Sequence, residues 1–206
     1  KYPHVNIMTD DLYEHLIYDD NEFHTFASIA PELKDRILTL NGVSKAYAMT
    51  GWRIGYAGGN ADLIRAMGKL QSQSTSNPTS ISQAAAVEAL NGDNSFINER
   101  ANMFKGRRDF LIKELNSMDG ITCRIPEGAF YVFPSCKGVI GKVDESNNEI
   151  TNDEEFTSLL LEHAGVAVVQ GSAFGLEGYF RISYATSDEN LKNACIRMRE
   201  FLSKLR

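Results

Sequence analysis

One lysine, Lys45, stands among small and uncharged residues in the densest motif of the sequence. The motif follows a strand-like run and reads Asn41-Gly42-Val43-Ser44-Lys45-Ala46-Tyr47-Ala48-Met49-Thr50-Gly51-Trp52-Arg53-Ile54-Gly55-Tyr56. A lysine amine is a poor nucleophile at its ordinary pKa of about 10.4, and it becomes useful for Schiff-base chemistry when burial or a nearby cation lowers that pKa. Lys45 has such a setting, although most lysines are simply solvated on a surface.

Two other segments place charged residues beside apolar strands. Asp10 follows the first predicted strand, at the sheet edge where α/β proteins usually bind ligands, although it could equally cap a helix. Arg181 interrupts the otherwise apolar run Tyr179 to Tyr184. A guanidinium buried there needs an anionic partner, such as an internal carboxylate.

The elements that would position these residues fall into two regions. The first has strand-like runs at 5–9, 36–40 and 52–57, followed by helices at 61–73 and 78–90, as in an α/β domain. A long helix of about 93–118 links it to a second region. That region has strands at 121–125, 129–133, 166–169 and 180–184 and helices at 153–163 and 188–204, which is typical of an α+β domain. We therefore place the domains at residues 1–100 and 101–206.

Composition narrows the possible partners. The net charge of −6 and the scattered basic residues argue against nucleic acid and membrane partners, and no apolar run approaches the length of about 20 residues that spans a bilayer. Neither the four histidines nor Cys123, Cys136 and Cys195 have metal-ligand spacing, so no metal site is predicted. We expect a cytoplasmic protein with reduced cysteines and a small-molecule partner.

The motif around Lys45 closely resembles the lysine signature of class I aminotransferases, the pyridoxal-phosphate enzymes of fold type I. The sequence from Ser44 to Tyr56 is typical of bacterial aspartate aminotransferases, including those that also transaminate prephenate. The similarity to this family runs over all 206 residues. The resemblance implies an α/β chain: the C-terminal part of the three-layer αβα large domain of that fold, followed by a smaller α+β domain.

The resemblance also assigns roles around Lys45. Lys45 would form the internal aldimine with pyridoxal phosphate and then move the proton between substrate Cα and the cofactor. Asp10 and Tyr13 match the family's Asp-x-x-Tyr, a carboxylate for the ring nitrogen and a phenol near the ring oxygen. Asp11 is one position off and is not expected to contact the ring nitrogen.

Anion binding is assigned in the same way. Arg53 would bind the cofactor phosphate, for which its planar fork of donors is suited, and Ser44 would be a further cofactor contact. Arg181 would grip the substrate α-carboxylate. The implied activity is a ping-pong transfer of the amino group between aspartate and 2-oxoglutarate in a homodimer, with prephenate or an aromatic 2-oxo acid as the next choice of substrate.

Two alternatives stay open. The same anchors serve other fold-type-I pyridoxal enzymes, such as lyases and synthases, and fold does not fix chemistry. The second alternative is a non-catalytic, aminotransferase-like sensing domain of a transcription regulator. The chain begins almost directly with a strand and has no initiating Met, so we expect an N-terminal half of comparable length to complete the site.

Overall fold

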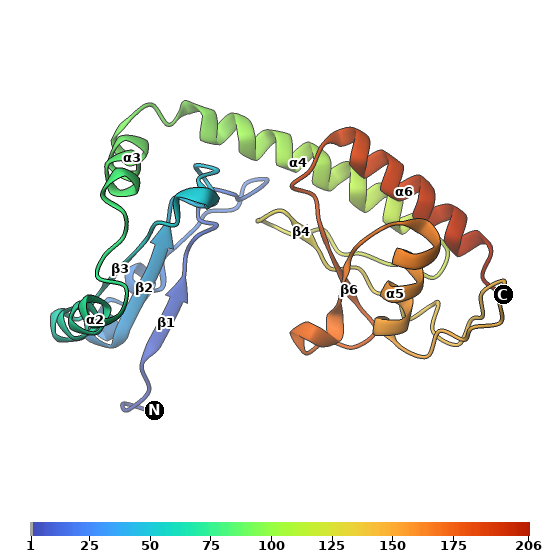
Figure 1. Cartoon of the computed structure of the whole chain (residues 1–206), viewed down its shortest axis with the longest axis horizontal. Coiled ribbons are helices and arrows are strands. Elements are labelled where there is room, and N and C mark those ends of the chain that lie inside the picture. The colour runs from blue at the N-terminus through green and yellow to red at the C-terminus, as the bar shows by residue number, and fades with distance from the viewer. Residues whose placement is uncertain (1) are drawn as a thin grey trace. The chain divides into compact units, whose positions relative to one another are not determined.

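The chain divides into two compact units, Lys1–Ala101 and Asn102–Arg206, in a computed structural model that describes residues 2–206. Helix α4 (Ser95–Asn116) begins in the first unit and ends in the second (Figure 1). The sequence predicted a long helix over about 93–118, and this prediction is confirmed to within two residues at each end.

A three-stranded sheet forms the centre of the first unit. Its strands β1 (Ile7–Asp10), β2 (Ile37–Gly42) and β3 (Gly55–Gly59) lie side by side in that order (Figure 1). Strand β1 is parallel to β2, and β3 is antiparallel to β2. The carboxyl ends of β1 and β2 therefore meet at one edge of the sheet, which is where α/β proteins bind ligands.

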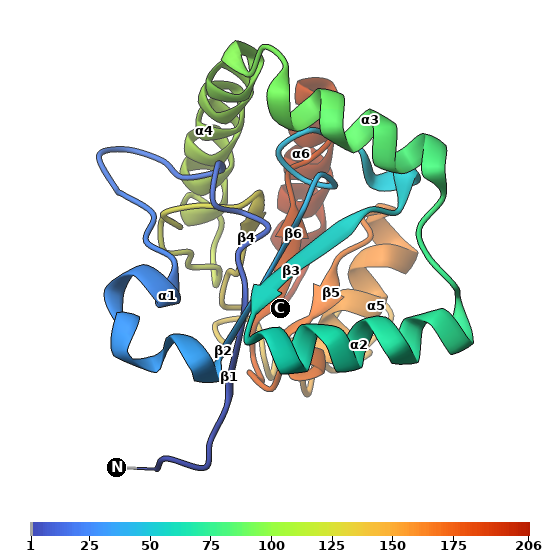
Figure 2. The same cartoon turned by 90° about the vertical axis from the view of Figure 1, so that its left-hand side faces the viewer.

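The helices of the first unit are α1 (Phe26–Ile29), α2 (Ala61–Ser74) and α3 (Ser80–Asn91), with 3₁₀ turns at Pro31–Arg36 and Thr50–Trp52. Helix α2 follows β3 directly (Figure 2). Its first backbone N–H groups are capped by the Asn60 side chain, which accepts from Asp62 N at 2.9 Å. A small buried cluster of Val43, Ile54 and Ala86 packs α3 against the segments before and after the 3₁₀ turn at Thr50–Trp52.

The second unit has a purely antiparallel sheet. Strand β6 (Phe180–Ser183) lies between β4 (Tyr131–Val132) and β5 (Val169–Gln170). Tyr131 pairs with Ser183, and Val169 pairs with Arg181. Because β6 is the central strand, its backbone is paired on both sides and its side chains are fixed in direction.

Helices α5 (Asp153–Ala164) and α6 (Asp188–Ser203) pack against each other in the second unit (Figure 1). The side chains of Asn152 and Ser187 cap their first turns, and Gly165 ends α5 in a left-handed conformation with φ of 62°. The ring of Phe156 on α5 lies 5.1 Å from that of Phe180 on β6. Aromatic packing thus fixes α5 on the sheet.

One predicted strand is wrong. The run 121–125 forms no strand, and within residues 2–206 its only sheet-like pairing is an isolated bridge between Thr122 and Ser135. The reason is local: the Asn116 side chain accepts from Cys123 N at 2.8 Å and donates to Cys123 O at 3.0 Å. Because these groups are already paired, Cys123 cannot extend a ladder.

The three cysteines form no disulfide among the described residues. Burial raises the pKa of the Cys136 thiol to about 12 and that of Cys195 to about 11. Both side chains are buried, so they serve packing rather than nucleophilic chemistry.

Candidate active site

The sheet edge at the ends of β1 and β2 gathers the first group of candidate residues. Asp10 is the last residue of β1, and it pairs in register with Leu40 of β2. Its side chain is exposed in this chain, and its Oδ1 accepts from Leu12 N at 3.3 Å. A cavity of about 500 Å³ has Asp10, Asn41 and Tyr56 among its lining residues. Asp10 therefore presents a carboxylate to open space at the predicted edge.

Lys45 and Tyr13 are brought together at the same edge. The Lys45 Nζ lies 5.5 Å from the centre of the Tyr13 ring. Lys45 is partly buried, and its turn is closed by hydrogen bonds from Ala48 N to Lys45 O at 3.1 Å and from Met49 N to Val43 O at 3.3 Å. The turn thus fixes the backbone from which the Lys45 side chain extends. Ser44 is also partly buried in this turn.

Asp11, rather than Asp10, is the buried carboxyl of this group. It is 7% exposed, and its Oδ2 makes no hydrogen bond within residues 2–206. Burial raises the pKa of Asp11 above its ordinary value, and the nearby carboxylates of Glu14 and Asp10 raise it further. Residue spacing alone gave no signal for this difference, because alternation along a strand does not tell which face the rest of the molecule covers.

Arg53 follows the 3₁₀ turn Thr50–Trp52 in an unusual backbone conformation. Its φ is 53°, in the left-handed region that residues with a Cβ rarely adopt. The guanidinium is exposed, and its Nη1 donates to Thr50 O at 2.8 Å. Its remaining N–H groups make no hydrogen bond within the described chain. A strained residue with unused donors is typical of a ligand-binding position.

Arg181 lies in the second unit, on β6, with its guanidinium close to two aromatic rings. Its guanidinium carbon is 4.7 Å from the centre of the Tyr131 ring and 4.4 Å from that of Phe174. No internal carboxylate pairs with it within residues 2–206, so the simplest alternative for a partly buried arginine, an internal ion pair, does not apply. Sequence reasoning missed both rings, although each belongs to a segment rich in aromatic residues and glycine.

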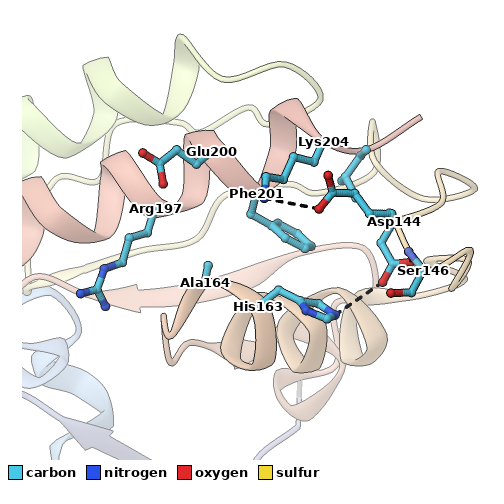
Figure 3. A pocket seen from close by; sticks show the side chains of 10 residues that line it. Asp144, Ser146, His163, Ala164, Arg197, Glu200, Phe201 and Lys204 are labelled. Atoms are coloured by element: carbon cyan, nitrogen blue, oxygen red, sulfur yellow. Dashed lines mark hydrogen bonds and ion pairs between the residues drawn. The ribbon is translucent and has the colours of Figure 1, made fainter.

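A separate hollow of about 350 Å³ in the second unit is lined by charged side chains (Figure 3). His163 Nε2 lies 3.5 Å from Asp144 Oδ2, and Lys204 Nζ lies 3.3 Å from Glu145 Oε2 (Figure 3). The Asn148 side chain donates to Asp144 at 2.8 Å and lowers the pKa of that carboxyl. These two contacts and the Asn148 hydrogen bond stabilise the turn that carries Asp144.

Two negative findings apply to residues 2–206. They contain no group of three or more histidine, cysteine, aspartate or glutamate side chains that could hold a metal ion. None of their helices combines the length and the apolar character needed to cross a bilayer.

Comparison with known proteins identifies the family. The model of the family described as aminotransferase class I and II matches residues 1–198. The chain belongs to this aminotransferase family. The fold class predicted from the sequence, part of the fold-type-I transferase architecture, is confirmed by solved structures. An aspartate aminotransferase from Rhizobium meliloti superposes with a TM-score of 0.97 at 56% identity, over 100% of this chain and 51% of that one.

Relatives in the aminotransferase family carry informative names. A "probable aspartate/prephenate aminotransferase" of Rhizobium leguminosarum bv. phaseoli is 60% identical over 201 residues, covering 98% of this chain and 50% of its own. An "aspartate/prephenate aminotransferase" of Cereibacter sphaeroides is 58% identical over 205 residues, covering 100% and 51%. A Thermus thermophilus aspartate aminotransferase structure with maleate has a TM-score of 0.85 at 38% identity, over 96% and 48%. The chain spans about half the length of these relatives.

Proposed function

We propose that the chain is the C-terminal half of a pyridoxal-phosphate-dependent aspartate aminotransferase, in which Lys45 is the catalytic lysine. Residues 1–100 would belong to the large cofactor-binding domain and residues 101–206 to the small domain. The observation that carries the proposal is the approach of Lys45 Nζ to the Tyr13 ring, 5.5 Å away, at the ends of β1 and β2. Family membership and the names of the relatives at 58–60% identity support it.

The candidate side chains of the first unit have the chemistry that binding of pyridoxal phosphate requires. An amine on Lys45 suits the aldehyde, the exposed Asp10 carboxylate suits a protonated ring nitrogen, and the Tyr13 phenol suits the ring oxygen. Arg53 keeps N–H groups available for a phosphate, and Ser44 lies next to the lysine. When bound, this cofactor supplies an electron sink that stabilises negative charge at the substrate Cα.

The remaining steps belong to this chain's own residues. The Lys45 amine would take the proton from the substrate Cα, because it lies beside the Tyr13 ring at the site edge. Arg181 would bind the substrate α-carboxylate through N–H groups that no internal carboxylate occupies. Fixing that carboxylate limits rotation of the bound substrate.

The proposal is tested with full-length protein loaded with pyridoxal phosphate. Aspartate should convert the absorption spectrum to that of the amine form, and 2-oxoglutarate should reverse the change. A protein that shows no half-reaction with any amino acid would sink the proposal. Irreversible elimination products would instead favour a lyase, and binding without any turnover would favour a sensing domain.

Substrate choice and assembly are finer parts of the proposal. We propose aspartate with 2-oxoglutarate first and prephenate second, because several relatives are named for both aspartate and prephenate. Comparison of kcat/KM for the two pairs decides the order. The homodimer and the cytoplasmic location stay predictions, and sedimentation of the full-length protein at micromolar concentration tests the first of them.

A further inference from the structure

We propose that Tyr131 and Phe174 are positioning residues whose rings clamp the Arg181 guanidinium and so fix the plane in which it binds a carboxylate. The inference deepens the proposed function, since it concerns how the substrate-binding arginine is held. It starts from the two ring contacts, at 4.7 and 4.4 Å, both well within the range of cation–π attraction of about 6 Å.

The sheet register explains the first ring. Tyr131 on β4 pairs with Ser183 on β6, two residues after Arg181. Residues two apart on a strand point to the same face, so Tyr131 and Arg181 are diagonal neighbours across the sheet. The Tyr131 ring is itself packed against Phe130, with ring centres 4.7 Å apart. The first side of the clamp is therefore set by strand pairing.

The second ring comes from the short 3₁₀ turn Gly171–Phe174. The Phe174 ring meets Phe133 in an edge-to-face contact at 5.9 Å. The buried carboxylate of Asp153 supports this turn, because its Oδ2 accepts from Ser172 N at 2.7 Å and its Oδ1 from Gly178 N at 3.2 Å. The segment that carries Phe174 is thus tied at both ends to the first turn of α5.

The clamp determines which edge of the guanidinium is available. The two rings, 4.7 and 4.4 Å from the guanidinium carbon, restrict how the group can turn, whereas its N–H groups point outward within its own plane. No carboxylate among residues 2–206 forms an ion pair with these donors. A planar carboxylate approaching in the same plane can accept two parallel hydrogen bonds. A guanidinium already held in this plane loses less rotational freedom on binding, which raises affinity.

The test compares variants of the full-length protein by calorimetric binding of maleate, an unreactive dicarboxylate. Phe174→Leu and Tyr131→Leu should each weaken maleate binding about threefold, the loss expected for one partly exposed cation–π contact. The KM for aspartate should rise in parallel, while kcat changes less than about twofold, because the carboxylate is gripped in the ground state and the transition state alike. Phe174→Tyr and Tyr131→Phe, which keep the ring face, should bind maleate like the unaltered protein.

Leu176→Ala is the matched control. Leu176 lies two residues from Phe174, is similarly exposed, 45% against 48%, and has no ring to offer Arg181. Unchanged maleate affinity in the leucine variants, or an equal loss in Leu176→Ala, would overturn the clamp. The clamp and the proposed function can fail separately. If maleate binding depends on the two rings but the protein shows no half-reaction, the clamp stands and only the aminotransferase function is refuted.

Discussion

The Lys45 amine lies 5.5 Å from the centre of the Tyr13 ring, although 32 positions separate the two residues along the chain (45 minus 13). The contact arises because β1 and β2 are parallel neighbours, so the segments that follow them leave the sheet at the same edge. It joins a potential nucleophile to a phenol, which is the pairing that the proposed function requires.

Replacing Lys45 tests this pairing directly. We expect Lys45→Ala in the full-length protein to lose the visible absorbance that pyridoxal phosphate gives when bound to an amine, together with transaminase activity. Lys69→Ala, which removes an exposed lysine of α2, should keep both. The spectrum of the reconstituted protein is the measurement, and an unchanged spectrum in Lys45→Ala would exclude Lys45 from the cofactor site.

At Arg53 we expect the requirements of protein stability and of pyridoxal phosphate binding to conflict. Because its φ is 53°, glycine should suit this position better than any residue with a Cβ. Arg53→Gly should be more stable to chemical denaturation than Arg53→Ala by about 1 kcal/mol. Both variants should bind pyridoxal phosphate more weakly than the unaltered protein. Equal stability of the two variants would show that the left-handed backbone is not maintained in solution.

We expect Asp153 to make the stability of the fold sensitive to acid. Burial raises the pKa of Asp153, but hydrogen bonds from Ser172 and Gly178 outweigh it, so the pKa lies below its usual value. A depressed folded-state pKa gives stability that is complete above the unfolded pKa of about 3.9 and is lost as pH falls through the folded value. Urea denaturation at pH 7 and pH 3 should therefore show a smaller decline for Asp153→Asn than for the unaltered protein.

The same carboxylate also matters at neutral pH. Asp153→Ala should lower the free energy of unfolding by about 2 kcal/mol, because it leaves two backbone N–H groups without their charged acceptor. Glu154→Ala, at the exposed neighbouring position, is the control and should change stability by less than about 0.5 kcal/mol. A similar loss in both variants would assign the effect to the helix end in general rather than to the Asp153 hydrogen bonds.

We expect any side chain at Gly171 to destabilise the fold by steric clash. A Cβ at this position would lie 2.3 Å from Leu176 O and 2.7 Å from Tyr179 O, and both atoms belong to the backbone. Gly171→Ala should lower the free energy of unfolding by about 3 kcal/mol, since the backbone must shift to make room. Gly106→Ala is the opposite case. Gly106 lies within α4 with open space around it, so alanine there should add about 0.5 kcal/mol. Thermal unfolding of the two variants should move in opposite directions.

Local sequence signals predicted most of the elements but not all of their pairings. The caps at Asn60 and Ser187 and the apolar period of the long helix gave α2, α6 and α4 close to their observed bounds. The strand expected at 121–125 failed because a side chain from α4, Asn116, occupies the backbone of Cys123. Such a contact depends on how a helix packs and leaves no periodic trace in the sequence.

The sequence by itself determined that Lys45 and Arg53 share one motif, because their spacing is fixed along a single stretch of chain. Only the tertiary structure decided that Asp11 is buried while Asp10 is exposed, and that the Arg181 guanidinium lies close to the rings of Tyr131 and Phe174. Propensities, caps and turns act over a few residues, whereas burial and cross-strand contacts depend on the register between segments far apart in the chain. Strand register is set by the packing of the whole sheet, and for that reason the environment of each candidate residue became known only with the fold.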